Sequence, residues 1–157
     1  MSDLERDENH TYRLRGIIIP GVTGILSAAG ITCLDMVPTE SLEQGRARGA
    51  AVHAATHYLD EDDLNWDTVK ENYLGYVRAY ESFKKESGFR PRQVERMVCN
   101  EEFWFAGQLD REGPISGRWL QTNGFPNVDQ DAEIPALIDL KTGLMDDATG
   151  LQLAGYD

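Results

Sequence analysis

A carboxylate and an ammonium group stand two residues apart near the end of one apolar segment, at Asp139 and Lys141. The segment of residues 136–141 is short and largely apolar, which predicts a strand. Residues two apart on a strand point to the same face, so Asp139 and Lys141 would lie side by side, opposite Ile138 and Leu140. Such a pair can bind a metal ion and position a water molecule. It is also found as a surface ion pair on ordinary half-buried strands.

Two weaker candidates for chemistry are an aspartate and a histidine elsewhere in the chain. Asp110 ends a predicted strand just before Gly113, a position where aspartate is more often a turn residue. His53 lies on a predicted helix rich in small residues, which lets that helix approach a neighbouring element closely. His57 follows one helical turn later. This spacing can place two metal ligands on one face, although a surface histidine is the more ordinary interpretation.

Six short motifs occur in a fixed order between residues 19 and 156. They are Pro-x-Val-Thr at 20–23, Gly-x-x-x-His at 49–53, Val-Glu at 94–95, Gly-x-x-Asp-Arg at 107–111, Asp-x-Lys at 139–141 and Gln-x-x-x-Tyr at 152–156. Together, in this order, they resemble the PD-(D/E)XK nuclease superfamily. The likeness is greatest to the RecB-like and CRISPR-associated DNA-end-processing exonucleases that are common in phages.

The resemblance implies a role for each matching residue. A divalent cation, Mg²⁺ or Mn²⁺, would be held by His53, Asp110 and Asp139, helped by the backbone carbonyl of Leu140. Lys141 would orient and help deprotonate the attacking water. Glu95 would hold the far end of the site. Gln152 and Tyr156 would contact the DNA or support Lys141. Carboxylate and histidine ligands suit these two metals, and phosphodiester hydrolysis needs such an ion to activate water.

The charge of the chain is strongly acidic, with 15 basic and 27 acidic residues and a net charge of −12. This balance opposes non-specific binding to nucleic acid. The bases between residues 78 and 96, however, form a cationic stripe that includes Lys84 and Lys85. We expect the stripe to lie near the metal site and the acidic cluster at 60–63 to lie on the far side. Lys84 and Lys85 are therefore candidate substrate-binding residues, although a solvated helix face would show the same pattern. Arg48, outside the stripe, is a further candidate.

The pattern of elements predicts an α+β protein with the restriction-endonuclease-like fold, in which helices flank a mixed central sheet and the C-terminal elements are shortened. Predicted helices cover residues 24–29, 38–59, 66–86 and 151 onward, and predicted strands cover 12–19, 93–98, 103–109, 118–120 and 136–141. Residues 1–10 read as a flexible acidic tail, and residues 11–157 as a single nuclease-like domain. Because the last helix is short, we expect a homo-oligomer or a partner chain at the C-terminal end.

Several classes of protein are excluded by composition. No apolar run approaches the roughly 20 residues that a membrane span needs, and the acidic first residues do not resemble a secretory signal. Cys33 and Cys99 cannot form a disulfide framework. The sequence therefore predicts a cytoplasmic protein, in the cytoplasm of the bacterial host if a phage encodes it.

The sequence thus predicts a metal-dependent DNA exonuclease or end-processing nuclease, acting in phage or bacterial DNA recombination, repair or replication. One alternative is a non-catalytic relative that keeps the fold as a DNA- or protein-binding module. Another is an acidic protein that mimics DNA. The combination of His53, Asp110, Asp139 and Lys141 favours the enzyme, because a binding module has no need of all four.

Overall fold

The structure is a computed structural model that describes residues 3–32, 37–143 and 147–156. The chain divides into two compact units. Unit 1 comprises Met1–Val37, Glu95–Asp110 and Met145–Asp157, and unit 2 comprises Pro38–Val94 and Arg111–Leu144. The prediction of a single domain over residues 11–157 stays a prediction.

Unit 1 begins with a three-stranded antiparallel sheet of β1 (Leu4–Arg6), β2 (Tyr12–Leu14) and β3 (Ile17–Ile19). The single strand predicted for residues 12–19 is wrong, because the chain reverses at Arg15 and Gly16. Their φ angles are 51° and 77°, the left-handed values that a two-residue hairpin turn requires. The expected frayed tail is also corrected, since Leu4 is buried against Tyr12, Leu14 and other residues of this core.

The remaining elements of unit 1 are α1 (Val22–Ala28) and α5 (Asp147–Ala154), which contact each other. Two glycines allow the last residues to pack closely. A Cβ on Gly155 would lie 3.2 Å from a Val22 methyl group, and one on Gly107 would lie 2.1 Å from the Tyr156 ring. The C-terminal segment is therefore packed within unit 1 itself. The oligomeric state stays a prediction.

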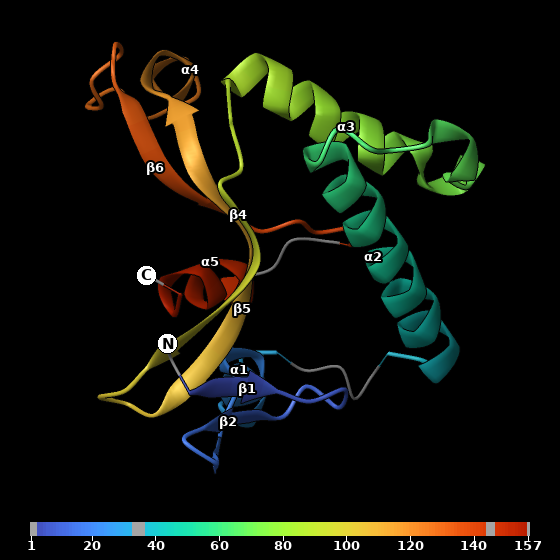
Figure 1. Cartoon of the computed structure of the whole chain (residues 1–157), viewed down its shortest axis with the longest axis vertical. Helices are drawn as coiled ribbons and strands as arrows, with labels where there is room; N and C mark the ends of the chain where they lie inside the picture. The colour runs from blue at the N-terminus through green and yellow to red at the C-terminus, as the bar shows by residue number, and fades with distance from the viewer. Residues whose placement is uncertain (1–2, 33–36, 144–146, 157) are drawn as a thin grey trace. The chain divides into compact units, whose positions relative to one another are not determined.

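Unit 2 contains two long helices that pack together, α2 (Thr39–Asp60) and α3 (Glu71–Ser87) (Figure 1). Both confirm the helices predicted from the apolar spacing, and Gly88 ends α3 with a φ of 66°. The short 3₁₀ helix η1 (Trp66–Thr68) is separated from α3 by extended backbone at Val69 and Lys70. The apolar spacing of α3 predicts that its aromatic stripe is core. Val77 and Tyr80 of this stripe are buried, whereas Tyr76 is 38% exposed.

A second three-stranded sheet has the order β4–β5–β6, formed by Gln93–Asn100, Phe105–Ser116 and Glu133–Ile138. Strands β5 and β6 are antiparallel, and Arg111 pairs with Ile138 (Figure 1). The α+β class is thus confirmed, with the described strands in two small sheets. The restriction-endonuclease-like arrangement with a mixed central sheet stays a prediction. Within the described residues, no helix combines the length and apolar character that crossing a membrane requires.

The strand predicted at residues 118–120 is instead part of the helix α4 (Gly117–Thr122). The Ser116 hydroxyl accepts a hydrogen bond from the backbone N–H of Trp119 at 3.4 Å, which caps the first turn of the helix. Gly117 also has a backbone oxygen so close that a Cβ would lie 1.9 Å from it. A serine followed by a glycine was therefore the helix-start signal in this connection.

Candidate active site

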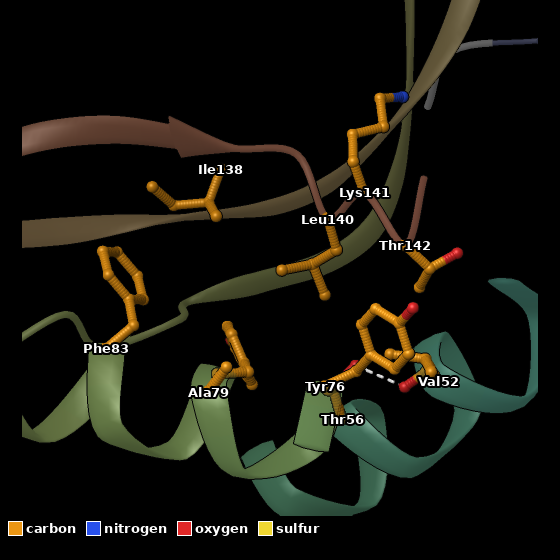
Figure 2. Close-up of a pocket in the computed structure, with 10 residues that line it drawn as sticks. Val52, Thr56, Tyr76, Ala79, Phe83, Ile138, Leu140, Lys141 and Thr142 are labelled. Carbon is orange, nitrogen blue, oxygen red and sulfur yellow. Dashed lines mark hydrogen bonds between the residues drawn. The ribbon is translucent and has the colours of Figure 1, made fainter. Parts of the chain in front are cut away.

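The Asp139–Lys141 pair lies just beyond the end of β6, because the strand stops at Ile138. The side chains nevertheless keep alternating as they would in a strand. Figure 2 shows Ile138 and Leu140 pointing toward α2 and α3, while Lys141 points away from these helices. Lys141 Nζ lies 2.8 Å from Asp139 Oδ2. The carboxylate and the ammonium are therefore side by side, as their spacing predicts.

The two members of this pair differ in exposure. The side chain of Asp139 is 5% exposed and that of Lys141 is 34% exposed. Asp139 Oδ2 is buried and, within the described part of the chain, no donor meets it in hydrogen-bond geometry. Its short distance to Lys141 is thus an ion pair without a well-aligned hydrogen bond. A buried carboxylate oxygen in this state is costly unless a cation or a donor compensates it.

His53 reaches the same segment from α2. Its Nε2 lies 3.1 Å from the carbonyl oxygen of Leu140, although the two residues are 87 positions apart in the chain. The small residues of α2 permit this approach, since a Cβ on Gly49 would lie 3.9 Å from the Thr142 hydroxyl. His57 does not share this environment. Its Nε2 lies 3.4 Å from Glu61 Oε1, in agreement with the surface-histidine interpretation.

Four other predicted site residues belong to unit 1. Asp110 lies inside β5, which continues to Ser116, so its interpretation as a turn residue is wrong. Glu95 lies inside β4 with a φ of 51°, which is unusual for a residue other than glycine, and its carbonyl accepts a hydrogen bond from Gln108 at 3.0 Å. Gln152 donates to the Tyr156 hydroxyl at 2.8 Å. The predicted convergence of His53, Asp110 and Asp139 on one cation stays a prediction.

The predicted substrate-binding cations are engaged in different ways. The Arg48 guanidinium lies 5.9 Å from the centre of the Tyr76 ring, and Lys85 Nζ lies 2.9 Å from Glu81 Oε1. Lys84 Nζ lies 2.8 Å from Asp60 Oδ1. The expectation that the acidic cluster at 60–63 lies far from the cationic stripe is therefore wrong, because the two meet at Lys84 and Asp60.

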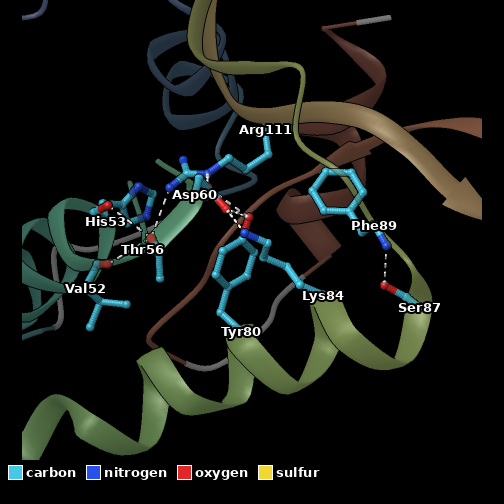
Figure 3. A network of polar contacts seen from close by, with 9 residues as sticks. All are labelled: Val52, His53, Thr56, Asp60, Tyr80, Lys84, Ser87, Phe89 and Arg111. Atoms are coloured by element: carbon cyan, nitrogen blue, oxygen red, sulfur yellow. Dashed lines mark hydrogen bonds and ion pairs between the residues drawn. The ribbon is translucent and has the colours of Figure 1, made fainter. Parts of the chain in front are cut away.

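A buried polar network around Asp60 was missed by the sequence analysis (Figure 3). Arg111 Nε donates to Asp60 Oδ2 at 2.5 Å, and Arg111 Nη2 donates to the Thr56 hydroxyl at 3.0 Å. The Tyr80 hydroxyl donates to the Asp60 carboxylate at 3.0 Å. Burial, together with the nearby Asp60 carboxylate, raises the pKa of Tyr80 well above its ordinary value. The network therefore joins α2, α3 and β5 through the Asp60 carboxylate. We call this carboxylate saturated because both of its oxygens accept hydrogen bonds from side chains.

An apolar cavity of about 300 Å³ lies between α2, α3 and the segment that carries Leu140 (Figure 2). Its walls include Val52, Ala79, Phe83 and Ile138. Lys141 and Thr142 also line it. Figure 2 shows the Lys141 ammonium pointing away from α2 and α3, although other atoms of this residue line the cavity.

The described part of the chain, 3–32, 37–143 and 147–156, holds no group of three or more His, Cys, Asp or Glu side chains arranged to bind a metal ion. No protein-family model, no curated protein and no solved structure matches the chain. Its function must therefore be inferred from the residues around Asp139, Leu140 and Lys141.

Proposed function

We propose that this chain is a divalent-metal-dependent DNA exonuclease or end-processing nuclease of the RecB-like kind, with a restriction-endonuclease-like fold. The observation that carries the proposal is the approach of His53 Nε2 to Leu140 O at 3.1 Å, beside the Asp139–Lys141 pair. His53 thus contacts the backbone between Asp139 and Lys141, and the two motifs contribute an imidazole, a carbonyl, a carboxylate and an ammonium. These are the groups that metal-assisted phosphodiester hydrolysis uses.

The residues of unit 2 fit a hard divalent cation. The carboxylate oxygen of Asp139 is buried without an aligned donor, and His53 Nε2 and Leu140 O already lie near each other. Mg²⁺ prefers oxygen ligands, and Mn²⁺ accepts an imidazole more readily. Asp110 is the proposed further carboxylate ligand. When bound, the metal would activate water and neutralise charge on the phosphoryl oxygens.

The protein's own contribution centres on Lys141. Its side chain is one-third exposed, whereas the side chain of Asp139, which it faces, is almost completely buried. Lys141 can therefore move toward an incoming phosphate or water while Asp139 stays in place. Asp139 Oδ2 holds the ammonium in the resting protein, so the cation is already close to the position where charge develops. We assign Lys141 to orienting the attacking water and accepting part of the developing negative charge.

The proposed partner is DNA. Glu95, Gln152 and Tyr156 are proposed to complete the site on the DNA side. A homo-oligomer or a partner chain at the C-terminal end, and action in the cytoplasm, are parts of the same proposal.

The test is cleavage of end-labelled linear and circular DNA, single- and double-stranded, with Mg²⁺, Mn²⁺ or EDTA. We expect metal-dependent release of nucleotides from linear DNA and none with EDTA. Lys141→Ala should lower the rate by about 10²-fold or more. Lys70→Ala is the matched control, because Lys70 is an exposed lysine of the same unit outside the candidate site.

Equal loss in both lysine variants would remove Lys141 from the mechanism. Binding of DNA without cleavage under any metal condition would instead favour the non-catalytic binding module.

A further inference from the structure

Arg111 connects the two elements that carry the candidate ligands of unit 2. It is a charged side chain with no exposed surface, on a strand, bonded to two residues of a helix. We propose that Arg111, acting through Asp60 and Thr56, is a positioning residue that holds His53 against Asp139. The inference rests on the proposed nuclease function, because it assigns a role at the same site.

The helix side of this connection is fixed at two successive turns. Asp60 and Thr56 stand four residues apart on α2 and therefore share one face of it. Arg111 Nε bonds to Asp60 Oδ2 at 2.5 Å while Nη2 bonds to the Thr56 hydroxyl at 3.0 Å. A planar guanidinium that bonds at two points restrains both the distance and the rotation of the helix. Lysine carries all its donors on one nitrogen, so it lacks the fixed spacing with which the guanidinium reaches both acceptors.

The chain of hydrogen bonds continues from Thr56 to the backbone of His53. The Thr56 hydroxyl donates to the carbonyl oxygens of Val52 and His53, at 2.9 and 3.0 Å (Figure 3). His53 is thus the residue whose backbone lies at the end of the Arg111 chain of hydrogen bonds. Its imidazole is the group that meets Leu140 O.

The strand side is equally direct. Arg111 pairs with Ile138 in the antiparallel register of β5 and β6. Asp139 follows Ile138 immediately, so the arginine stands opposite the point where the Asp-x-Lys segment begins. One side chain therefore joins the backbone next to Asp139 with the backbone of His53. A loss of this connection changes the separation of the two candidate ligands, and a misplacement of about 1 Å can lower a rate by about 10²-fold.

The test removes the hydroxyl that joins the network to His53. Thr56→Val keeps the shape of the side chain but cannot accept from Arg111 or donate to His53. Thr122→Val is the matched control, because Thr122 donates to the carbonyl of Arg118 at 3.0 Å on the exposed surface of α4. Mn²⁺ affinity is measured by titration calorimetry, and kcat and KM are measured with linear DNA.

We expect Thr56→Val to weaken Mn²⁺ binding and to lower kcat, each by about tenfold, with little change in KM. Thr122→Val should change neither. Thr56→Ser restores the hydroxyl and should restore both quantities, which a loss of packing alone would not explain. If Thr56→Val does not fold, Arg111→Lys serves in its place, since it keeps the charge beside Asp60 and loses the bond to Thr56.

Two results separate this inference from the proposed function. A wild-type chain that cleaves DNA with Mn²⁺, together with a folded Thr56→Val variant of equal Mn²⁺ affinity and kcat, overturns the role of Arg111 alone. A wild-type chain that neither binds Mn²⁺ nor cleaves DNA overturns both.

Discussion

Two ion pairs of unit 2 have similar lengths but differ in exposure and in the number of donors that reach the carboxylate. Asp60 Oδ2 lies 2.5 Å from Arg111 Nε, and these side chains are 2% and 0% exposed. Asp139 and Lys141 are 2.8 Å apart, with side chains 5% and 34% exposed. The first carboxylate also receives Lys84 and the Tyr80 hydroxyl. The second has an oxygen that no donor, within the described residues, meets in hydrogen-bond geometry.

The difference separates a carboxylate that holds elements together from one that is available to a cation. Asp60 accepts hydrogen bonds from three side chains, so its removal would leave the buried Arg111 without this carboxylate. Asp139 is buried beside Lys141, whose side chain is one-third exposed. Both carboxylates are therefore buried. They differ in whether hydrogen-bond donors reach their oxygens.

The largest expected effect is on stability at the first pair. Asp60→Ala should lower the free energy of unfolding by about 3–5 kcal/mol, because a buried guanidinium loses its partner. Asp139→Ala should lower it by less than about 1 kcal/mol, since Lys141 can turn to water. Denaturant unfolding of both variants measures the contrast. Equal losses would show that the two pairs serve the same structural role.

A smaller effect is expected at the tyrosine of the saturated site. Tyr80→Phe removes one donor to the Asp60 carboxylate and leaves Lys84 and Arg111 in place. A hydrogen bond to a charged group contributes about 1.5–3 kcal/mol, and the two remaining cations should reduce the loss toward the lower end. Denaturant unfolding at neutral pH checks this value. An unchanged stability would mean that the carboxylate does not depend on this donor.

The same tyrosine makes the saturated site sensitive to alkali. Burial raises the pKa of Tyr80 in the folded protein above its ordinary value of 10.0, so the folded state keeps this proton longer than the unfolded state. Stability from this group is therefore complete below pH 10 and is lost as the pH rises above it. The free energy of unfolding, measured from pH 8 upward, should fall more steeply with pH in the wild type than in Tyr80→Phe. Parallel curves would contradict the raised pKa.

Sequence reasoning succeeded where a local pattern determines the outcome. The side-by-side placement of Asp139 and Lys141 followed from alternation along an extended segment, and the two long helices followed from apolar spacing. It failed at Arg15 and Gly16, where two left-handed residues divide one apparent strand. An Arg-Gly pair inside a β-branched run was the available signal for that turn.

The Arg111 network lay beyond local patterns, because its partners are 51 and 55 residues away. Asp60 was grouped with its acidic neighbours, although its position one turn after Thr56 places it on the buried face of α2. A sequence assigns charge to a residue but cannot show which charge is buried. Only the packing of α2 against β5 separates Asp60 from the exposed acids that follow it.

The smallest expected effect on stability concerns the cationic stripe. The same variant tests whether the stripe contacts DNA. Lys84 is unsuitable as a probe, because Lys84→Glu would place a second carboxylate beside Asp60 and disturb folding. Lys85 is 70% exposed and pairs only with Glu81 among the contacts that the structure gives it, so Lys85→Glu should change stability by less than about 0.5 kcal/mol. If the stripe contacts phosphates, the same variant should weaken DNA binding and make it less dependent on salt by about one unit of slope. Affinity measured at several salt concentrations distinguishes the two cases, since an unchanged slope would identify Lys85 as part of a solvated helix face.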